Sequence, residues 1–296
     1  MYDVAILGAG PAGLSAGIYC ARGGLSVAIV EKSSAGGQAS TAHEIQNYPG
    51  IKSIGGFDLA YAMLEQCQSF GCDFVFDSPV SYALEGDVKR IEFASQTLEA
   101  KNVIIATGAH SRPLGTPREK EFTGKGISYC ATCDGMFFKN KTVAVIGGGN
   151  TAAADALYLE KIAKKVYLVH RRNALRADDI LAKRLENSTV EVLWDSVVSS
   201  LDGEDMLTQI TLKNVKTDAL NPRSVDGVFV AIGQIPNAEE FDTLKKDDAG
   251  YIITDENMRT NISGVYAVGD VRHKSLRQVV TACADGAIAS DTIINE

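Results

Sequence analysis

The sequence predicts an α/β fold composed of two domains of the same doubly wound, three-layer type, with one domain inserted into the other. An apolar run of strand length that opens into a glycine-rich turn occurs twice, from residue 4 and again from residue 143. Each copy is followed by a helical pattern and a second apolar run, which is typical of a parallel sheet covered by helices. Linker-like segments near residues 112–113 and 234–239 bracket the second copy, so we expect it to be the inserted domain.

The chain has the size and composition of a soluble globular protein. Its 296 residues are enough for two domains, each with a core of its own. The net charge of −8, without any basic run, argues against nucleic-acid binding. Residues 4–21 carry no charge, but their glycines and proline, with no basic segment before them, are not those of a membrane span or a signal peptide. We therefore expect a cytoplasmic protein that has no membrane partner.

The first copy of the pattern carries a complete dinucleotide-binding fingerprint. A strand over residues 4–7 opens into Gly-Ala-Gly-Pro-Ala-Gly at 8–13, and a helix is expected from Pro11 to Arg22. The first glycine permits the turn, the second lets the backbone approach a pyrophosphate at the helix N-terminus, and the third allows close packing on the strand. A second strand over residues 25–30 ends on Glu31, whose carboxylate would reach a ribose hydroxyl.

The second copy differs from the first at the position that contacts the ribose. Its strand covers residues 143–146, its turn 147–152, its helix about 151–161 and its second strand 166–169. Residue 147 lies 139 positions after residue 8, and the same displacement carries Glu31 onto His170. Arg171 and Arg172 follow directly, and Arg176 is a further candidate contact.

A carboxylate at this position would repel a 2′-phosphate, whereas guanidinium groups bind one well. The first domain is therefore predicted to hold a nucleotide without the 2′-phosphate, and the second domain NADP(H). The alternative is that His170, Arg171 and Arg172 form a solvated surface charge cluster. Their location at the end of the second strand, the reading position where the fingerprint contacts the ribose, argues against this interpretation.

A cysteine pair lies between the two fingerprints, in Tyr-Cys-Ala-Thr-Cys-Asp-Gly at residues 129–135. Cysteines with two residues between them can close a disulfide, and one thiol of such a pair can become a reactive thiolate. Asp134 could supply or accept the proton that thiol–disulfide exchange requires. Half of a zinc site is the first alternative, but only Cys67 and Cys72 could complete it, and we expect no metal. Two inert buried thiols are the second alternative.

The remaining segments complete the predicted sheets. Residues 33–56 are expected to form an irregular loop, followed by a helix from Phe57 that ends at Gly71. Short segments of alternating apolar and polar residues over 72–100 indicate a small group of extra β-strands, a β excursion from the main pattern. Buried strands are expected at 103–108, 228–233 and 264–270, further strand-like segments across 190–215, and a last helix over about 276–294.

Taken in order, the motifs resemble those of the low-molecular-weight thioredoxin reductases, of the pyridine nucleotide-disulfide oxidoreductase family. They are the turn at 8–13, Cys-Ala-Thr-Cys-Asp at 130–134, Gly-Gly-Gly-Asn-Thr-Ala at 147–152, His-Arg-Arg at 170–172 with Arg176, and Tyr-Ala-Val-Gly-Asp at 266–270. The resemblance covers essentially the whole chain. It implies two Rossmann-like domains: an FAD-binding domain from residues 1–112 and 239–296, and an inserted NADPH-binding domain over 113–238 that also carries the cysteine pair.

The resemblance also implies a homodimer that passes electrons from NADPH through FAD and a Cys130–Cys133 disulfide to thioredoxin or a thioredoxin-like protein. Cys133 would be the flavin-proximal cysteine, Cys130 the one that attacks thioredoxin, and Asp134 the acid–base. The implied FAD contacts are Gly8, Gly10, Pro11, Ala12, Gly13, Glu31, Lys32, Gly37, Gln38, Asn47, Ala106, Thr107, Gly108, Gly269, Asp270, Arg277, Gln278 and Val279. The implied NADPH contacts are Gly147, Gly149, Asn150, Thr151, Ala152, His170, Arg171, Arg172, Arg176, Ile232 and Gly233.

The chain departs from the family pattern after the second fingerprint, where relatives usually carry two acids and this sequence has Ala154-Asp155. The four other cysteines match no redox position, and we expect them to be packing residues: Cys20, Cys67, Cys72 and Cys283. Three other functions are open. A flavin reductase that serves ferredoxin would not need the cysteine pair, and a thioredoxin reductase fed by ferredoxin would not need the arginines. A nucleotide-binding sensor would perform no turnover.

Overall fold

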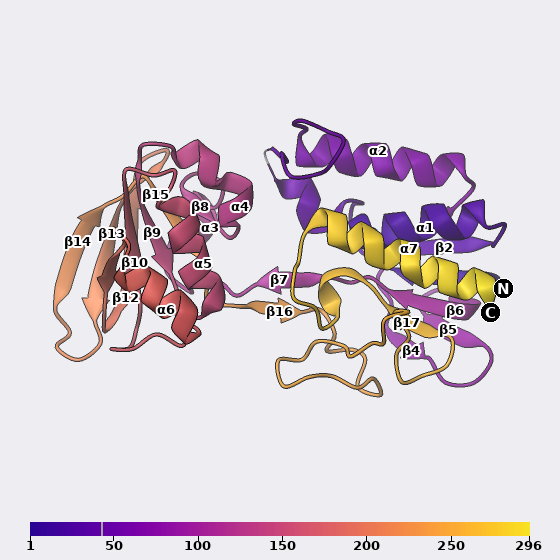
Figure 1. The fold of residues 1–296 in the computed structure, drawn as a ribbon. Helices are drawn as coiled ribbons and strands as arrows, with labels where there is room; N and C mark the ends of the chain where they lie inside the picture. Colours follow the sequence, from indigo (N-terminus) through magenta and orange to yellow (C-terminus); the bar gives the residue numbers. More distant parts are fainter. Residues whose placement is uncertain (43) are drawn as a thin grey trace. The chain divides into compact units, whose positions relative to one another are not determined.

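The computed structural model describes residues 1–42 and 44–296 and divides the chain into two compact units (Figure 1). Unit 1 comprises Met1–His110 and Ile235–Glu296, and unit 2 comprises Ser111–Gln234. Unit 2 is thus inserted in the sequence of unit 1. No helix in the described part of the chain is long and apolar enough to cross a membrane.

Unit 1 is built on a seven-stranded sheet in the order β3-β2-β1-β6-β5-β4, with β17 also paired to β6. Its strands are β1 (Tyr2–Leu7), β2 (Val27–Glu31), β3 (Asp73–Phe76), β4 (Ser81–Ala83), β5 (Lys89–Glu92), β6 (Thr97–Ile105) and β17 (Val265–Ala267). The β3-β2-β1-β6-β17 part is parallel, whereas β4, β5 and β6 pair antiparallel. The expected β excursion therefore adds to the edge of the main sheet.

Both faces of this sheet are covered, which explains why its central strands are apolar throughout. Helices α1 (Pro11–Arg22), α2 (Gly56–Ser69) and α7 (Val279–Asn295) lie on one side (Figure 1). Val4 and Ile6 of β1 belong to the core on that side. Ala5 and Leu7 belong to the opposite core, which includes buried side chains from β5 and from the segment after β16.

Unit 2 is built on a parallel five-stranded sheet in the order β11-β10-β9-β15-β8 and a separate antiparallel sheet β12-β13-β14. Its strands are β8 (Ile127–Ser128), β9 (Thr142–Ile146), β10 (Lys165–Val169), β11 (Glu191–Leu193), β12 (Ser196–Gly203), β13 (Leu207–Asn214), β14 (Leu220–Ser224) and β15 (Gly227–Val230). Its helices are α3 (Glu119–Phe122), α4 (Ala131–Asp134), α5 (Asn150–Leu159) and α6 (Asp179–Glu186). One core joins the two sheets, and the other joins the parallel sheet to α5 and α6.

Three short 3₁₀ helices complete the description: η1 (Gly37–Thr41), η2 (Gly135–Phe138) and η3 (Gly269–Val271). They explain two differences from the expected elements. The loop at 33–56 contains η1, and the strand expected at 264–270 ends at Ala267 because the chain turns into η3. Gly269 has a φ of +73°, a backbone conformation that glycine adopts without strain.

Two further differences have local causes. The last helix starts at Val279 instead of about residue 276, because Gln278 caps it and forms a capping box with Thr281. Strand β14 was not expected, because its sequence is polar and contains Pro222. A proline is tolerated there because β14 pairs on one side only, with β13, and is an edge strand.

The two segments that connect the units pair with each other as β7 (Ala109–Ser111) and β16 (Gln234–Pro236). Arg112 N donates a hydrogen bond to Gly233 O at 2.9 Å, and Asn237 N donates to Gly108 O at the same distance. The Asn237 side chain also donates to Thr107 O at 2.7 Å. The two connecting segments therefore form a short two-stranded ribbon, with a backbone hydrogen bond at each of its ends.

Candidate redox and nucleotide-binding sites

The two cysteines of the central motif form a disulfide, with their Cα atoms 5.3 Å apart. Cys130 is the N-cap of α4, and its Sγ accepts a hydrogen bond from Cys133 N at 3.2 Å. Both residues are half-buried. Within residues 1–42 and 44–296, no group of three histidine, cysteine or acidic side chains is placed to hold a metal ion.

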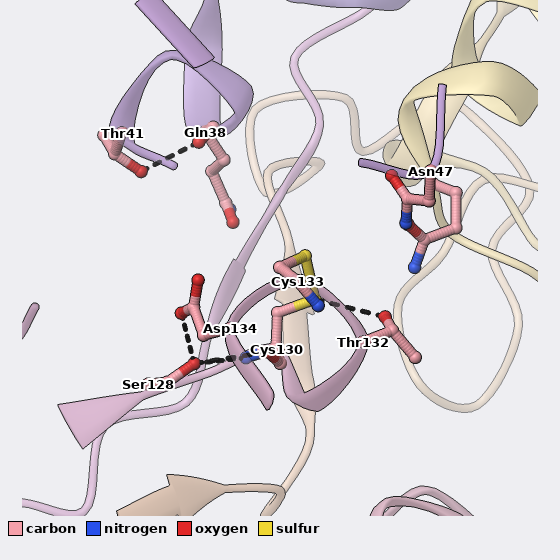
Figure 2. Close-up of a disulfide and its surroundings, with 9 residues drawn as sticks. Gln38, Thr41, Asn47, Ser128, Cys130, Thr132, Cys133 and Asp134 are labelled. Carbon is pink, nitrogen blue, oxygen red and sulfur yellow. Dashed lines mark hydrogen bonds between the residues drawn. A yellow bond between two sulfur atoms is a disulfide. The ribbon is translucent and has the colours of Figure 1, made fainter. Parts of the chain in front are cut away.

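Asp134 is held beside the disulfide by a serine that sequence reasoning did not select (Figure 2). The Ser128 hydroxyl donates to Asp134 Oδ2 at 2.6 Å and accepts from Cys130 N at 3.1 Å. Asp134 N donates to Cys130 O at 3.1 Å. The only signal in the sequence is a polar residue at the end of a short apolar strand, directly before the cysteine motif.

Glu119 is a second residue that the sequence did not single out. Its carboxylate is buried and accepts hydrogen bonds from Leu114 N at 2.7 Å, Gly115 N at 2.9 Å and the Tyr129 hydroxyl at 2.6 Å. Burial, together with the hydrogen bond to Glu119, raises the pKa of Tyr129 to about 12, so the phenol stays protonated. Glu119 thereby ties the segment that enters unit 2 to the residue before Cys130.

The first fingerprint forms a tight turn between β1 and α1. Gly8 has a φ of +108°, and a Cβ added to it would lie 2.5 Å from Ala106 O. A Cβ on Gly13 would lie 1.9 Å from Gly8 O, so neither position accepts a side chain. Pro11 opens α1, and the first turn contains no acidic residue, which leaves the positive end of the helix available to an anion.

Glu31 lies beside this turn, at the end of β2. Its carboxylate accepts from Ala9 N at 2.9 Å and from Ser33 N at 3.1 Å. Lys32 forms an exposed ion pair with Glu240. Gly37 approaches the turn closely, because a Cβ on it would lie 3.2 Å from Gly10 Cα.

Asp270 offers a buried acceptor at the end of the β17 segment. In the described part of the chain its Oδ1 is buried and has no hydrogen-bond partner, and burial raises the pKa of the carboxyl group. Arg277 Nε is likewise buried and unpartnered, with its guanidinium 4.0 Å from the centre of the Tyr251 ring. Buried polar atoms normally have partners, so this acceptor and donor fit a bound group that carries hydroxyls and acceptors, as the ribityl chain and ring of a flavin do.

The Asp270 turn is anchored by Asp285, a buried acid of α7. Asp285 Oδ2 accepts from Gly269 N at 3.0 Å and from Lys274 Nζ at 2.8 Å, and Arg272 forms a second ion pair with the same carboxylate. The remaining predicted FAD contacts are also in unit 1. Asn47 donates to Gln278 at 3.0 Å, Ala12 is buried at the start of α1, Gln38 lies in η1, Val279 begins α7, and Ala106, Thr107 and Gly108 follow β6.

The second fingerprint repeats the turn in unit 2, between β9 and α5. Gly147 has a φ of +155°, and Ala152 is buried against it. Gly149 is the N-cap of α5, Thr151 is exposed, and Asn150 exchanges two 2.7 Å hydrogen bonds with Asp178. Ile232 and Gly233 follow β15, where Gly233 O accepts the bond from the connecting segment.

The arginines and the histidine at the reading position face different environments. Arg171, Arg172 and Arg176 are exposed, and no ion pair involves them in the described residues. Arg176 N donates to Gly148 O at 2.6 Å, which places Arg176 at the fingerprint turn. His170 is 6% exposed, and its Nε2 lies 3.0 Å from Ala174 O. Burial lowers the pKa of His170, so its ring is neutral and supports the turn from within.

Residues 2–286 match the family model for pyridine nucleotide-disulphide oxidoreductases, and the chain therefore belongs to that family. A thioredoxin reductase of Peptoclostridium acidaminophilum is 46% identical, over 98% of this chain and 95% of that protein. One of Treponema pallidum is 42% identical over the same shares. The crystal structure of thioredoxin reductase from Streptococcus pyogenes matches with a TM-score of 0.92 at 44% identity, covering 100% of this chain and 97% of that one.

These similarities confirm the predicted fold class, with two dinucleotide-binding domains, and the resemblance on which the expectations rest. The chain is an oxidoreductase, and its family implies the use of a flavin and a nicotinamide dinucleotide.

Proposed function

We propose that this chain is a thioredoxin reductase that passes electrons from NADPH through FAD and the Cys130–Cys133 disulfide to a thioredoxin-like protein. The observation that carries the proposal is that disulfide, held with Asp134 in the same unit as the exposed arginine cluster of Arg171, Arg172 and Arg176. Relatives named thioredoxin reductase, at 42–46% identity over nearly the whole chain, support the same function.

The two nucleotides are assigned to different units. Unit 1 is proposed to hold FAD at the Gly8–Gly13 turn, with Glu31 on the adenosine ribose and Asp270 and Arg277 toward the flavin portion. Unit 2 is proposed to hold NADPH, with Arg171, Arg172 and Arg176 on the 2′-phosphate. When bound, FAD supplies a carrier that accepts a hydride and releases two electrons, and the protein positions it. The other contacts are those named above for each cofactor.

The cysteines perform the final exchange in two steps. In the reduced enzyme, the Cys130 thiolate attacks one sulfur of the partner's disulfide, so that a mixed disulfide forms and a partner thiolate leaves. The Cys133 thiolate then attacks Cys130 Sγ, which restores the Cys130–Cys133 disulfide and releases the second partner thiolate. Two protons pass from the enzyme's thiols to the partner's sulfurs, and Asp134 is the group proposed to transfer them.

Three other proposals fit the site less well. A ferredoxin-linked flavin reductase leaves the disulfide without a use, and a ferredoxin-fed thioredoxin reductase leaves the arginines without a ligand. A sensor without turnover has no need of Asp134 fixed beside the disulfide. The active form is proposed to be a homodimer, as the family resemblance implies, and to be located in the cytoplasm, as the sequence suggests.

The decisive experiment follows the flavin absorbance of the purified protein under anaerobic conditions. NADPH should bleach the yellow colour, and an oxidised thioredoxin should restore it with the appearance of two thiols per molecule. Bleaching that only ferredoxin or dioxygen can reverse would support a flavin reductase. A protein that NADPH does not bleach would contradict the proposal.

Two serine variants test the roles of the cysteines. Cys130→Ser should leave Cys133 as a thiolate against oxidised flavin and show a long-wavelength charge-transfer band, whereas Cys133→Ser should lack the band. Both variants should lose disulfide reduction while NADPH still reduces their flavin. A band in Cys133→Ser alone would reverse the two assignments.

A further inference from the structure

We propose that Ser128 is a positioning residue for the dithiol–disulfide exchange, which it influences through Asp134. The inference deepens the proposed function, because it assigns the group that holds the acid–base in place. Asp134 is the proposed proton-transfer group, and in the described residues its carboxylate has one hydrogen-bond partner, the Ser128 hydroxyl (Figure 2).

The hydrogen bonds around Ser128 form a closed ring. Cys130 N donates to Ser128 Oγ, Ser128 Oγ donates to Asp134 Oδ2, and Asp134 N donates to Cys130 O. The ring therefore fixes both the backbone and the carboxylate of Asp134 relative to Cys130. Cys130 is held from its other side as well, because its Sγ accepts from Cys133 N.

Ser128 is itself held rigidly. It is 5% exposed and is the last residue of β8, the edge strand of the parallel sheet, where it pairs with Phe229 of β15. A buried side chain at the end of a paired strand has little freedom to move. The Ser128 hydroxyl therefore ties the redox loop to the end of β8, in addition to the main chain and the hydrogen bond between Tyr129 and Glu119.

The proton of that hydroxyl is directed at the carboxylate. Ser128 Oγ lies 2.6 Å from Asp134 Oδ2 but 3.3 Å from Cys130 O, and a serine has a single proton to donate. Since an efficient proton-transfer group must stay within hydrogen-bond reach of its target, a carboxylate free to rotate would transfer protons more slowly. Ser128 is thus inferred to keep the Asp134 carboxyl group in one orientation during both exchange steps.

The test measures the exchange alone. Enzyme reduced with dithiothreitol and desalted is mixed with the small disulfide DTNB, and the rate of thiolate release is recorded. This probe needs neither NADPH nor thioredoxin, so a wrong assignment of the electron donor or protein partner does not affect it. Ser128→Ala should slow the exchange roughly 10- to 100-fold, a part of the usual general acid–base contribution. NADPH reduction of the flavin should be unchanged.

Three variants make the result specific. In a cycle with Asp134→Asn, the double variant should be no slower than Asp134→Asn alone, because both changes remove one function. Ser128→Thr, which retains a hydroxyl, should recover most of the rate. Ser188→Ala is the matched control. The Ser188 hydroxyl, in the same unit, also accepts a hydrogen bond from the backbone N–H two residues later, that of Val190. Removing the Ser188 hydroxyl should leave the exchange rate unchanged.

An additive double variant, or a Ser128→Thr enzyme as slow as Ser128→Ala, would overturn the proposal. So would a Ser128→Ala enzyme that exchanges at the rate of the unmodified protein. Thermal unfolding of each variant shows whether it is folded. Should Ser128→Ala fail to fold, Ser128→Val, which has the shape of threonine but no hydroxyl, takes its place in the cycle and in the comparison with Ser128→Thr.

Discussion

Asp155 on α5 carries a charge that the fold disfavours. Burial raises the pKa of its carboxyl group from 3.8 to about 6. An acid with a raised pKa in the folded state binds its proton more tightly there than in the unfolded chain. Below about pH 4 the carboxyl group is protonated in both the folded and the unfolded chain and does not affect stability. Between about pH 4 and 6 its ionisation lowers the free energy of unfolding progressively, and above pH 6 the loss is complete.

Asp155→Asn should accordingly increase the free energy of unfolding at pH 8 by up to about 3 kcal/mol. The gain should shrink steadily as the pH falls below 6. Urea unfolding at pH 5 and pH 8 measures it, with Asp205→Asn, a change to an exposed acid, as the control. A gain that is independent of pH would show that burial of the charge is not the cause.

The arginines at the second reading position should determine the choice of nucleotide. Each charge-assisted hydrogen bond contributes about 1.5–3 kcal/mol. Replacing Arg171 and Arg172 together by alanine should weaken NADPH binding by roughly two to four orders of magnitude, because both phosphate contacts are lost. NADH binding should barely change.

Titration calorimetry with both nucleotides measures this preference. Arg184→Ala, which removes an exposed arginine of α6 in the same unit, is the control and should bind NADPH normally. Equal affinity of the unmodified protein for NADPH and NADH would refute the assignment of the phosphate site.

At the level of elements, the turn between β9 and α5 depends on the imidazole ring of His170, which packs under it. A Cβ on Gly148 would lie 2.1 Å from His170 Nδ1, whereas a Cβ on Gly149 would meet open space. Gly148→Ala should therefore destabilise the protein by about 1–3 kcal/mol, the usual cost of overpacking. Gly149→Ala should change the stability by no more than about 0.5 kcal/mol. Denaturant unfolding of both variants checks this; equal losses would mean that the His170 ring moves aside freely.

Under the proposed function, the whole molecule serves one flavin ring with two reactions. NADPH would deliver a hydride to that ring, and the ring would pass electrons to Cys133, yet the cysteine pair and Arg171, Arg172 and Arg176 belong to the same unit. We expect unit 2 to swivel on the segments near residues 112–116 and 234–239, so that nicotinamide and cysteines exchange at the flavin. Such domain motions occur in microseconds to milliseconds.

A disulfide engineered between the two units tests the swivel. A cross-linked enzyme should retain either flavin reduction by NADPH or thioredoxin reduction, but not both, according to the orientation trapped. The two half-reactions are followed separately by stopped-flow absorbance, with the corresponding single-cysteine variants as controls. Turnover of the locked enzyme at the unlocked rate would show that no swivel is needed.

The features that the sequence alone could predict are those encoded in continuous stretches. The fingerprint turns and the cysteine spacing depend on neighbouring residues, so their glycines and thiols identify them directly. The repeat at a displacement of 139 positions also revealed the contrast between Glu31 and the arginines, because it required only a comparison of the chain with itself.

The tertiary structure alone decided which side chains support these motifs. Asn237 bonds Thr107 across 130 positions, and Glu119 joins the entering segment to Tyr129. His170 stands at a reading position, yet its ring is buried under Gly148. Ser128 looks like an ordinary strand residue until β8 is paired with β15 and its hydroxyl meets Asp134. Such roles depend on the direction in which a side chain points after packing, and residue type and spacing do not specify that direction.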